Sequence, residues 1–591
     1  MSEEIIRIAN CSGYYGDRLS AAKEMVDGGP IDVLTGDYLA ELTMTILFNQ
    51  KMQRGDDKGY VGTFLKQVKA VAKTCKNENI KIVTNAGGLN PSSMANEIEK
   101  ILEELNISLK VAYISGDDLV PRMDSLKEDG ESFLNIDKNI PIDESGCQTL
   151  TANAYLGAWG IKEALDEGAD IVVCPRVTDA AVVIGPAAWK FKWKRDDYDA
   201  LAGALAAGHI IECGCQATGG NYSFFKEVPS FDNVGYPIAE IKNDGSFYIT
   251  KHPGTGGLVS TGTVTAQLLY EISSPAYLNP DVIAHFDTLN IEEVSKDRVY
   301  VSGCRGSSPT NTHKVCINLA GGYRNGMEFI LTGIDIEEKA QIITDALFNS
   351  VGGKEQFDEV SILLDRTDKK DPNSNEEAMA SLRISVKSKD PDLVGRMFTA
   401  KMIELALANY PGFFTGGGVR SGGPVLVYWP ALIDSKHIKE TVHIDGKEID
   451  VMPTNQMNLE ETYYQKQPIE IPAHHSGETL NKPLGELFGA RSGDKGGCAN
   501  IGVWAKSKNA FSFLNNYLTV ERIKELMPDI REFEIDRYEL PNILSLNFYI
   551  HDILEDGVSS NTRKDGQAKS LGEYLRAKYA DIPKSLFEEN I

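Results

Sequence analysis

The stretch Ile5-Ile6-Arg7-Ile8-Ala9-Asn10, which stops at Cys11-Ser12-Gly13, sets the pattern that decides the fold. It is a short apolar run that ends abruptly in polar residues and glycine and precedes a segment of helical character. Strands that are covered on both faces are apolar throughout, so the pattern predicts an α/β fold with a large parallel sheet. Both an open doubly wound sheet and a closed barrel fit it. The pattern recurs at residues 31–35 before Gly36-Asp37-Tyr38, at 80–84 before Asn85-Ala86-Gly87-Gly88, at 109–114 before Ser115-Gly116-Asp117-Asp118, and at 169–174 before Pro175-Arg176-Val177-Thr178-Asp179.

The regular segments divide the chain into two predicted domains, residues 1–464 and 484–591, joined by a linker at 465–483. The first domain contains an α+β insert at about 335–410, with two helices on a small sheet. Residues 205–330 are rich in glycine and β-type runs, and they either complete the main sheet or form loops over its edge. The last hundred residues predict a ferredoxin-like order of strand 484–490 resumed at 499–505, helix 510–527, strands 531–540 and 545–551, and helix 570–577. Helices of the main domain are expected at 39–52, 61–74, 91–105 and 154–167.

Composition limits the classes of function. The chain has 591 residues, 42% of them hydrophobic, which is enough for more than one core. Its net charge of −25 argues against a nucleic-acid partner, whereas a small anion remains compatible if a few arginines gather locally. No apolar run has the length of a membrane span, and the acidic start Met1-Ser2-Glu3-Glu4 is unlike a secretion signal, so a cytoplasmic location is expected. Nine scattered cysteines predict reduced thiols.

Polar residues collect where the predicted strands end, which is the edge that binds ligands in α/β folds. Arg176 and Asp179 are placed so that one can bind a carboxylate while the other takes a proton, or so that both form an ion pair that closes the turn. Asp37 faces the same edge and is a second candidate for proton transfer. Substrate contacts are expected from the neighbouring strand ends, at Ser12, Gly13, Asn85, Gly87 and Gly88. The aspartates of this edge, with Asp117 and Asp118, are also suited to Mg²⁺.

A glycine-rich loop at residues 251–264 leads into a predicted helix at 263–272. Free backbone N–H groups at Gly254, Gly256 and Gly257 would bind a phosphate or carboxylate, although a tight turn with a helix cap explains the same residues. The spacing matches neither the nucleoside-triphosphate loop nor the dinucleotide fingerprint. His252, beside this loop, is a candidate acid or base or else a structural histidine.

Three further groups complete the candidates. Arg420 lies in the loop 416–424, where it would bind a carboxylate or belong to a plain crossover. The segment 491–497 contains Arg491, Asp494 and Lys495 and is expected to be a loop that faces the ligand or the other domain. His209-x-x-x-Cys213-x-Cys215 offers three zinc ligands but no visible fourth, so no metal is expected there.

Several of these segments together resemble the acyclic terpene utilisation family over nearly the whole chain. They are Asn10 to Asp17, Thr35 to Glu41, Asn85-Ala86-Gly87-Gly88, Cys174 to Asp179, Ala490 to Gly497, and the late segment Glu539-Leu540-Pro541-Asn542 to Leu546-Asn547-Phe548. The resemblance implies a C-terminal ferredoxin-like domain and a link to a pathway that degrades branched acids as coenzyme A thioesters. It carries over no set of catalytic residues, and Cys498 departs from the small or acidic residue usual at its position.

The residues and the resemblance together favour a catabolic enzyme that acts on a small carboxylic acid or its acyl-CoA thioester, namely a lyase of hydro-lyase type or one that cleaves a C–C bond. Such acid–base chemistry needs no redox cofactor, and none is expected. His252, Asp179, Asp37 and Lys495 are the expected catalytic residues, with Arg176, Arg420, Arg491 and Asp494 binding the substrate. Two alternatives remain open: a non-catalytic acyl-CoA-binding or assembly subunit, and a metal-dependent hydrolase. A homo-oligomer is expected, with no membrane partner.

Overall fold

The computed structural model describes residues 4–418, 421–453 and 477–588, and its largest element is an open mixed sheet. The five predicted strands lie side by side and parallel at the centre of this sheet. Antiparallel strands extend the sheet at both ends instead of closing it, so it is open and not a barrel. The central order is β1 (Ile5–Asn10), β2 (Val33–Gly36), β3 (Lys81–Gly88), β6 (Ile171–Pro175) and β4 (Val111–Ser115).

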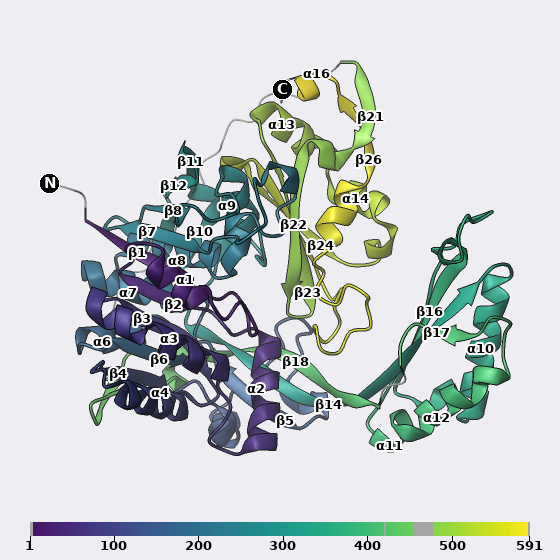
Figure 1. Ribbon diagram of the computed structural model, residues 1–591, viewed down its shortest axis with the longest axis horizontal. Helices are drawn as coiled ribbons and strands as arrows, with labels where there is room; N and C mark the ends of the chain where they lie inside the picture. Colours follow the sequence, from purple (N-terminus) through teal and green to yellow (C-terminus); the bar gives the residue numbers. More distant parts are fainter. Residues whose placement is uncertain (1–3, 419–420, 454–476, 589–591) are drawn as a thin grey trace.

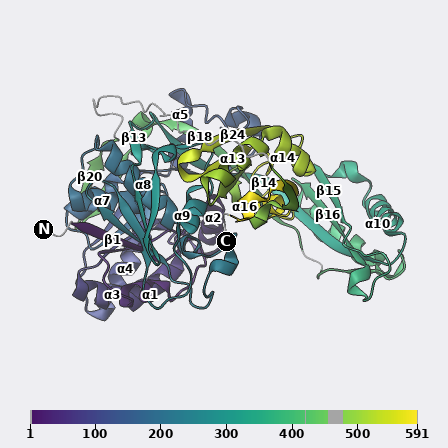
Figure 2. The same cartoon turned by 90° about the horizontal axis from the view of Figure 1, so that it is seen from above.

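The central strands are apolar because each of them serves two cores. On β2, Val33 packs into one core and Leu34 into the other, as side-chain alternation in a strand requires. Figure 2 shows the helices in two layers with β1 between them. One layer contains α1 (Ala21–Asp27), α3 (Gly62–Glu78) and α4 (Pro91–Leu105), and the other contains α6 (Trp159–Asp166), α7 (Ala181–Phe191) and α8 (Tyr198–Ile211).

Helix α4 has the predicted bounds because its ends carry strong local signals. The Asn90 side chain accepts a hydrogen bond from the Ser93 N–H at 3.3 Å, and Pro91 occupies the first turn, where its missing N–H costs nothing. Asn106 ends the helix in the left-handed conformation, with φ of 54°.

Four strands within residues 205–330 extend the main sheet, and other strands of this segment lie in separate sheets. Beyond β1 lie β7 (Pro237–Lys242), β8 (Phe247–Lys251), β12 (Arg298–Ser302) and β11 (Asn290–Ser295), and beyond β4 lie β19 (Glu440–Ile444) and β20 (Lys447–Val451). Within the described residues the sheet therefore has eleven strands.

One long strand, β14 (Thr312–Thr332), connects the main body to the α+β insert. Its first half pairs with β5 (Thr149–Ala154) and its second half with β16 (Met379–Ser388), and β18 (Gly423–Asp434) follows it on the return. The pairing of β5 also explains why the helix expected at 154–167 begins only at Trp159. The insert has its own core, formed by its sheet and by α10 (Ile336–Ser350) and α12 (Arg396–Glu404), and it projects from the body in Figure 1.

The C-terminal domain is an antiparallel sheet in the order β22 (Phe488–Lys495), β23 (Cys498–Ala505), β25 (Ser545–Ile550) and β24 (Ile535–Leu540). Helices α13 (Lys508–Tyr517) and α14 (Val520–Leu526) connect β23 to β24, and α15 (Leu571–Arg576) follows later. The expectation of a loop at 491–497 is wrong, because β22 pairs with β23 as far as Lys495. Its glycines allow close packing: a Cβ on Gly493 would lie 2.5 Å from the Tyr270 ring.

Asparagine side chains of this domain attach it to the main body. The Asn500 side chain donates to the Leu269 carbonyl at 2.6 Å and accepts from the Glu271 N–H at 3.0 Å. Asn547 donates to the Ile272 carbonyl at 3.2 Å, and Asn542 donates to the Phe286 carbonyl at 2.9 Å. These hydrogen bonds between asparagine side chains and backbone groups hold the two domains in a fixed relative position.

All nine cysteines are free, as expected from their scattered positions. Within residues 4–418, 421–453 and 477–588, no helix combines the length and apolar character needed to cross a bilayer.

Candidate active site

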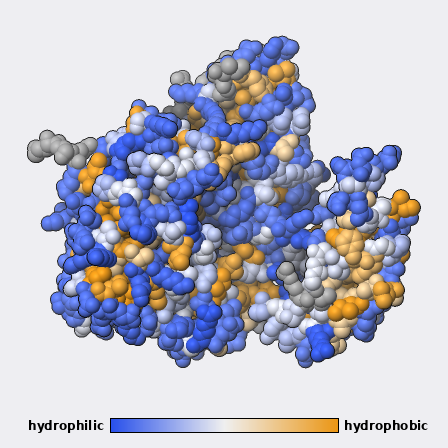
Figure 3. Space-filling model, viewed as in Figure 1, coloured by the Kyte–Doolittle hydropathy of each residue, from blue (hydrophilic) through white to orange (hydrophobic). Residues whose placement is uncertain are grey.

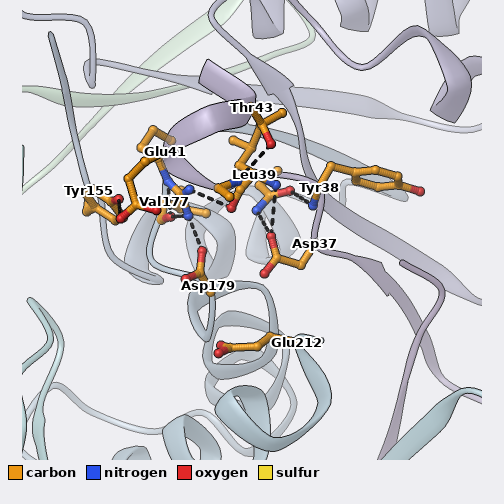
Figure 4. A network of polar contacts seen from close by, with 12 residues as sticks. Asp37, Tyr38, Leu39, Glu41, Thr43, Tyr155, Val177, Asp179 and Glu212 are labelled. Atoms are coloured by element: carbon orange, nitrogen blue, oxygen red, sulfur yellow. Dashed lines mark hydrogen bonds and ion pairs between the residues drawn. The ribbon is translucent and has the colours of Figure 1, made fainter. Parts of the chain in front are cut away.

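Three carboxyl groups converge at the carboxyl edge of the main sheet. Asp37 follows β2, Asp179 follows β6, and Glu212 caps the end of α8. Each offers one carboxylate oxygen, and these three oxygens lie within 4.8 Å of one another (Figure 4). We call this group the acidic triad. The edge rule predicted the two aspartates, whereas Glu212 was missed because it ends a helix and not a strand.

Asp37 is held by the neighbouring strand end. Its Oδ1 accepts from the Asn85 side-chain amide at 2.5 Å and from the Leu39 N–H at 3.3 Å. The side-chain Oδ1 of Asn85 in turn accepts from the Tyr38 N–H at 2.8 Å. Asn85, an expected substrate contact, therefore positions the Asp37 carboxylate.

Arg176 is 1% exposed, and most of its donors are used within the chain. Nη1 donates to the Leu39 carbonyl at 2.9 Å, Nε donates to the Val177 carbonyl at 2.9 Å, and Nη2 pairs with Asp179. The guanidinium also stacks on the Tyr155 ring, 4.5 Å from its centre. The ion pair that closes the turn is thus present, and Arg176 positions Asp179 more than it offers a free fork to a substrate.

Glu212 has a nearly buried side chain, 8% exposed, with one unpaired oxygen. Its Oε1 lies 3.1 Å from Nδ1 of His209, while its Oε2 has no hydrogen-bond partner among the described residues. Burial lowers the pKa of His209 to about 4, so this imidazole is neutral at physiological pH. His209 lies beside Glu212, and Cys215 donates its thiol to the Val234 carbonyl. Among the described residues, His209, Cys213 and Cys215 therefore do not converge on one metal position.

Crowding of the triad shifts its protonation. Burial and the nearby charge of Asp179 raise the pKa of Asp37 well above its ordinary value. Burial, Asp179 and then Glu271 do the same to the pKa of Glu212. Three carboxylates this close cannot all be ionised unless a cation compensates their charge.

The C-terminal domain supplies one wall of the site through the end of β22. The Lys495 ammonium lies 5.5 Å from the centre of the Tyr277 ring. Its positive charge acts to lower the pKa values of Glu212, His209 and Glu41. In the described part of the chain Lys495 forms no ion pair with a carboxylate. Its ammonium is therefore available to an anionic ligand.

Asp494 and Glu271 form a second acidic group beside Lys495. Burial, then the charge of Glu271, raises the pKa of Asp494 to about 7. Lys569 lies between them, 3.9 Å from Asp494 and 3.6 Å from Glu271. Glu271 has the left-handed φ of 56°, which the Asn500 contact holds in place, and strained positions of this kind cluster at functional sites. The sequence gives no local signal for Glu271.

A polar network around Glu41 lies between the main body and β14. Tyr155 and Tyr428 donate their hydroxyls to Glu41 Oε1 at 3.2 and 3.3 Å, and the Lys314 ammonium lies at 3.4 Å. Burial alone would raise the pKa of Glu41, but Lys314 and further cations outweigh it and lower that pKa to about 2. Glu41 is therefore ionised.

His252 and the glycine loop are not part of this group. The His252 side chain is buried, donates to the Met25 carbonyl at 2.8 Å and packs against Gly28. The N–H groups of Gly256 and Gly257 donate to the carbonyls of Asn233 and Ser230 at 2.9 and 2.8 Å, so they are not free to bind an anion. The turn with a helix cap is the arrangement observed here, since the Ser260 side chain caps α9 (Thr261–Leu268), and Gly254 makes the turn with φ of 78°.

The other expected substrate contacts have internal partners. The Ser12 hydroxyl donates to the Tyr14 carbonyl at 3.1 Å. Cβ atoms on Gly13 and Gly87 would lie 2.5 Å from the backbone of Cys213 and of Cys174, and one on Gly88 would meet Leu47. Arg491 stacks on Tyr270 at 4.3 Å and donates to the Asn221 carbonyl at 3.3 Å, which serves domain docking. Arg420 lies outside the described residues.

Two hollows lie away from the triad. Their volumes are about 240 and 680 Å³, and both include Asp244 of the turn between β7 and β8, which is at the amino edge of the central strands. Figure 3 shows a hydrophilic, hollowed face between the C-terminal domain and the α+β insert. The carboxylates and Lys495 therefore mark the candidate site by chemistry and not by cavity size.

Two family models match this chain over most of its length. The family model described as "Acyclic terpene utilisation family protein AtuA" matches residues 6–444. A second model, the AtuA ferredoxin-like domain, matches residues 482–579, which contain β22 to α15. No curated protein matches the chain significantly. Acyclic terpene utilisation points to a catabolic role. The first match spans well over half of the chain, and the protein belongs to the acyclic terpene utilisation AtuA family.

Proposed function

We propose that the protein is a catabolic lyase that adds or removes water, or cleaves a C–C bond, in a small carboxylic acid or its acyl-CoA thioester. One observation carries the proposal: a lysine without an ion-pair partner in the described residues faces a cluster of carboxyl groups at the ligand-binding edge of the sheet. The lysine comes from one domain and the cluster from the other, so the domains build the site together.

Lys495 is the proposed anchor for the substrate. An ammonium without an ion-pair partner suits a substrate carboxylate or the carbonyl oxygen of a thioester. Tyr277 supplies the aromatic face beside it, and the net charge around the cluster remains acidic. A single anionic group on the substrate is therefore compatible with the site, whereas a polyanion such as nucleic acid is not.

Asp494 and Glu271 are the proposed groups for proton transfer. A carboxyl group whose pKa lies near 7 can give and take protons at neutral pH, and Asp494 has a pKa of about 7. In a dehydration, Glu271 would accept the proton next to the carbonyl and Asp494 would protonate the hydroxyl, which leaves as water. Arg176 and Asn85 act as positioning residues for Asp179 and Asp37, and His252 has no role in this proposal.

The test begins with a screen of small organic acids and acyl-CoA esters by mass spectrometry. With a converted compound in hand, Lys495→Met is expected to raise KM about 10-fold or more, and Asp494→Asn to lower kcat about 100-fold. Lys508→Met, an exposed lysine of α13, is the matched control and should change neither constant.

Unchanged kcat/KM in both Lys495→Met and Asp494→Asn would contradict the assignment. Thermal stabilisation by acyl-CoA esters without any product would instead support a binding subunit.

A further inference from the structure

We propose that the acidic triad of Asp37, Asp179 and Glu212 binds one hard divalent cation, Mg²⁺ or Mn²⁺. The inference deepens the proposed function by giving the triad a role, and it rests on that function only for its catalytic consequence. The binding of the ion itself is independent of the substrate.

The spacing of the donor atoms fits a small cation. In an octahedral site with oxygens at about 2.1 Å, neighbouring ligands are about 3 Å apart and opposite ligands about 4.2 Å apart. The three triad oxygens lie within 4.8 Å of one another, so side-chain rotations that bring the oxygens closer together would complete the site. All three donors are carboxylate oxygens, which favour Mg²⁺ or Mn²⁺ over zinc.

The unpaired oxygen of Glu212 is the second, independent observation. The Glu212 side chain is more than nine-tenths buried and lies next to Asp37 and Asp179 (Figure 4), and its Oε2 has no hydrogen-bond partner among the described residues. Buried polar atoms in folded proteins almost always have a partner. A cation between the three carboxylates would supply that partner.

Two of the three carboxylates also have an outer partner that fixes their orientation. Asn85 donates to Asp37, and Arg176 pairs with Asp179. Such outer partners are typical of metal ligands, because they orient the donor oxygens before the ion arrives. The three elements that carry the ligands are anchored in two hydrophobic cores.

The position of Asp179 gives the ion access to a substrate. Its side chain is 32% exposed, while the other two ligands are buried, so the open coordination positions face outward. The bound ion would hold a carboxylate or hydroxyl oxygen of the substrate and neutralise the charge that develops on it. Lys495 would bind a second oxygen of the same molecule.

The experiment measures metal binding on the full-length protein. The protein is treated with a chelator, dialysed and titrated with MnCl₂, with free Mn²⁺ followed by electron paramagnetic resonance. We expect one site per chain that Mg²⁺ competes for. Glu212→Gln and the partly exposed Asp179→Asn should weaken Mn²⁺ binding about 100-fold, and Asn85→Ala about 10-fold or more. Melting curves identify any variant that fails to fold.

Glu440→Gln is the matched control, because Glu440 is an equally buried carboxylate that accepts a hydrogen bond from the Gly160 N–H at 3.1 Å. It should bind Mn²⁺ as the wild type does. Absence of stoichiometric Mn²⁺ binding, or unchanged binding in Glu212→Gln and Asp179→Asn, would overturn the site. If chelator-treated protein turns over substrate and binds no Mn²⁺, the metal site is contradicted and the proposed lyase activity stands. If the protein binds Mn²⁺ but has no lyase activity on any acid or thioester, the proposed function is contradicted and the metal site stands.

Discussion

Two groups of buried carboxyls, the acidic triad and the pair Asp281 and Glu440, differ in how their oxygens are satisfied. Asp281 accepts the Ala158 N–H at 2.9 Å, and Glu440 accepts the Gly160 N–H at 3.1 Å, so both cap the start of α6. In the acidic triad, Asp37 and Asp179 are held mainly by the side chains of Asn85 and Arg176, and Glu212 keeps an unpaired oxygen. Burial raises carboxyl pKa values in both places, so burial alone does not mark a site. The unpaired oxygen and the convergence of three elements do.

The largest effect is expected from Arg176, whose buried guanidinium pairs with Asp179 of the triad. Arg176→Met should destabilise the protein by about 3 kcal/mol, because it leaves Asp179 and two carbonyls without their partner while Asp179 keeps some solvent. Urea unfolding of both proteins measures the difference. Arg366→Met, which breaks an exposed pair with Asp368, is the control and should leave the midpoint unchanged. Equal behaviour of the two variants would contradict the positioning role of Arg176.

The second prediction separates the two acidic groups by activity. Glu212→Gln should reduce turnover of the substrate about 100-fold, because it removes one of the three converging carboxylates. Glu440→Gln should stay within about two-fold of the wild type, since Glu440 lies at the start of α6 and its amide replacement can still accept from Gly160. Similar losses in both variants would show that buried carboxyls matter only for folding.

The third prediction tests the pH dependence of the group at the start of α6. Burial, then the charge of Asp281, raises the folded-state pKa of Glu440 to about 8, against an ordinary value of 4.5. Between these values the folded protein holds a proton that the unfolded chain has lost, so this contribution to stability is complete below pH 4.5 and is lost as pH rises through 8. The free energy of unfolding of Glu440→Gln should therefore gain on the wild type by about 1 kcal/mol per pH unit between pH 6 and 8. Parallel pH profiles would refute it.

The smallest effect is expected at His252, the histidine that the sequence favoured. His252→Gln loses the ring packed against Gly28 and weakens the contact with the Met25 carbonyl, which should cost about 1 kcal/mol of stability. Turnover should remain within about two-fold of the wild type. If turnover falls 100-fold or more while the variant still folds, His252 belongs to the active site, and the assignment of the site to the carboxylates and Lys495 is contradicted.

The sheet was predictable because each central strand carries its signal locally. An apolar run followed by polar residues identified β1, β2, β3, β4 and β6, and the rule that parallel strands share their carboxyl edge brought Asp37 and Asp179 to one place. Asp494 and Lys495 were expected to come from the C-terminal domain, and the structure places them near the cluster. The signal for Glu212 was present but unused: it is a carboxylate directly after the long apolar run of α8.

Other features depend on contacts between distant residues and had no local signal. The backbone N–H of Glu271 is held by Asn500, which is 229 positions later, and His252 is fixed by Met25, 227 positions earlier. The glycines of β22 suggested a loop, but they serve close packing of a strand against Tyr270. The glycine loop near His252 suggested an anion site, but its N–H groups pair with carbonyls from a neighbouring segment. Glycine reports backbone freedom or close approach, and only the partners decide which.

Anomalous diffraction from a crystal grown with MnCl₂ tests the central claim most directly, namely that Asp37, Asp179 and Glu212 together bind a divalent cation at the candidate site. The account predicts one strong manganese peak within about 2.5 Å of an oxygen from each of the three side chains. A difference map without a peak between these carboxylates, at a concentration that saturates the protein in solution, would contradict it.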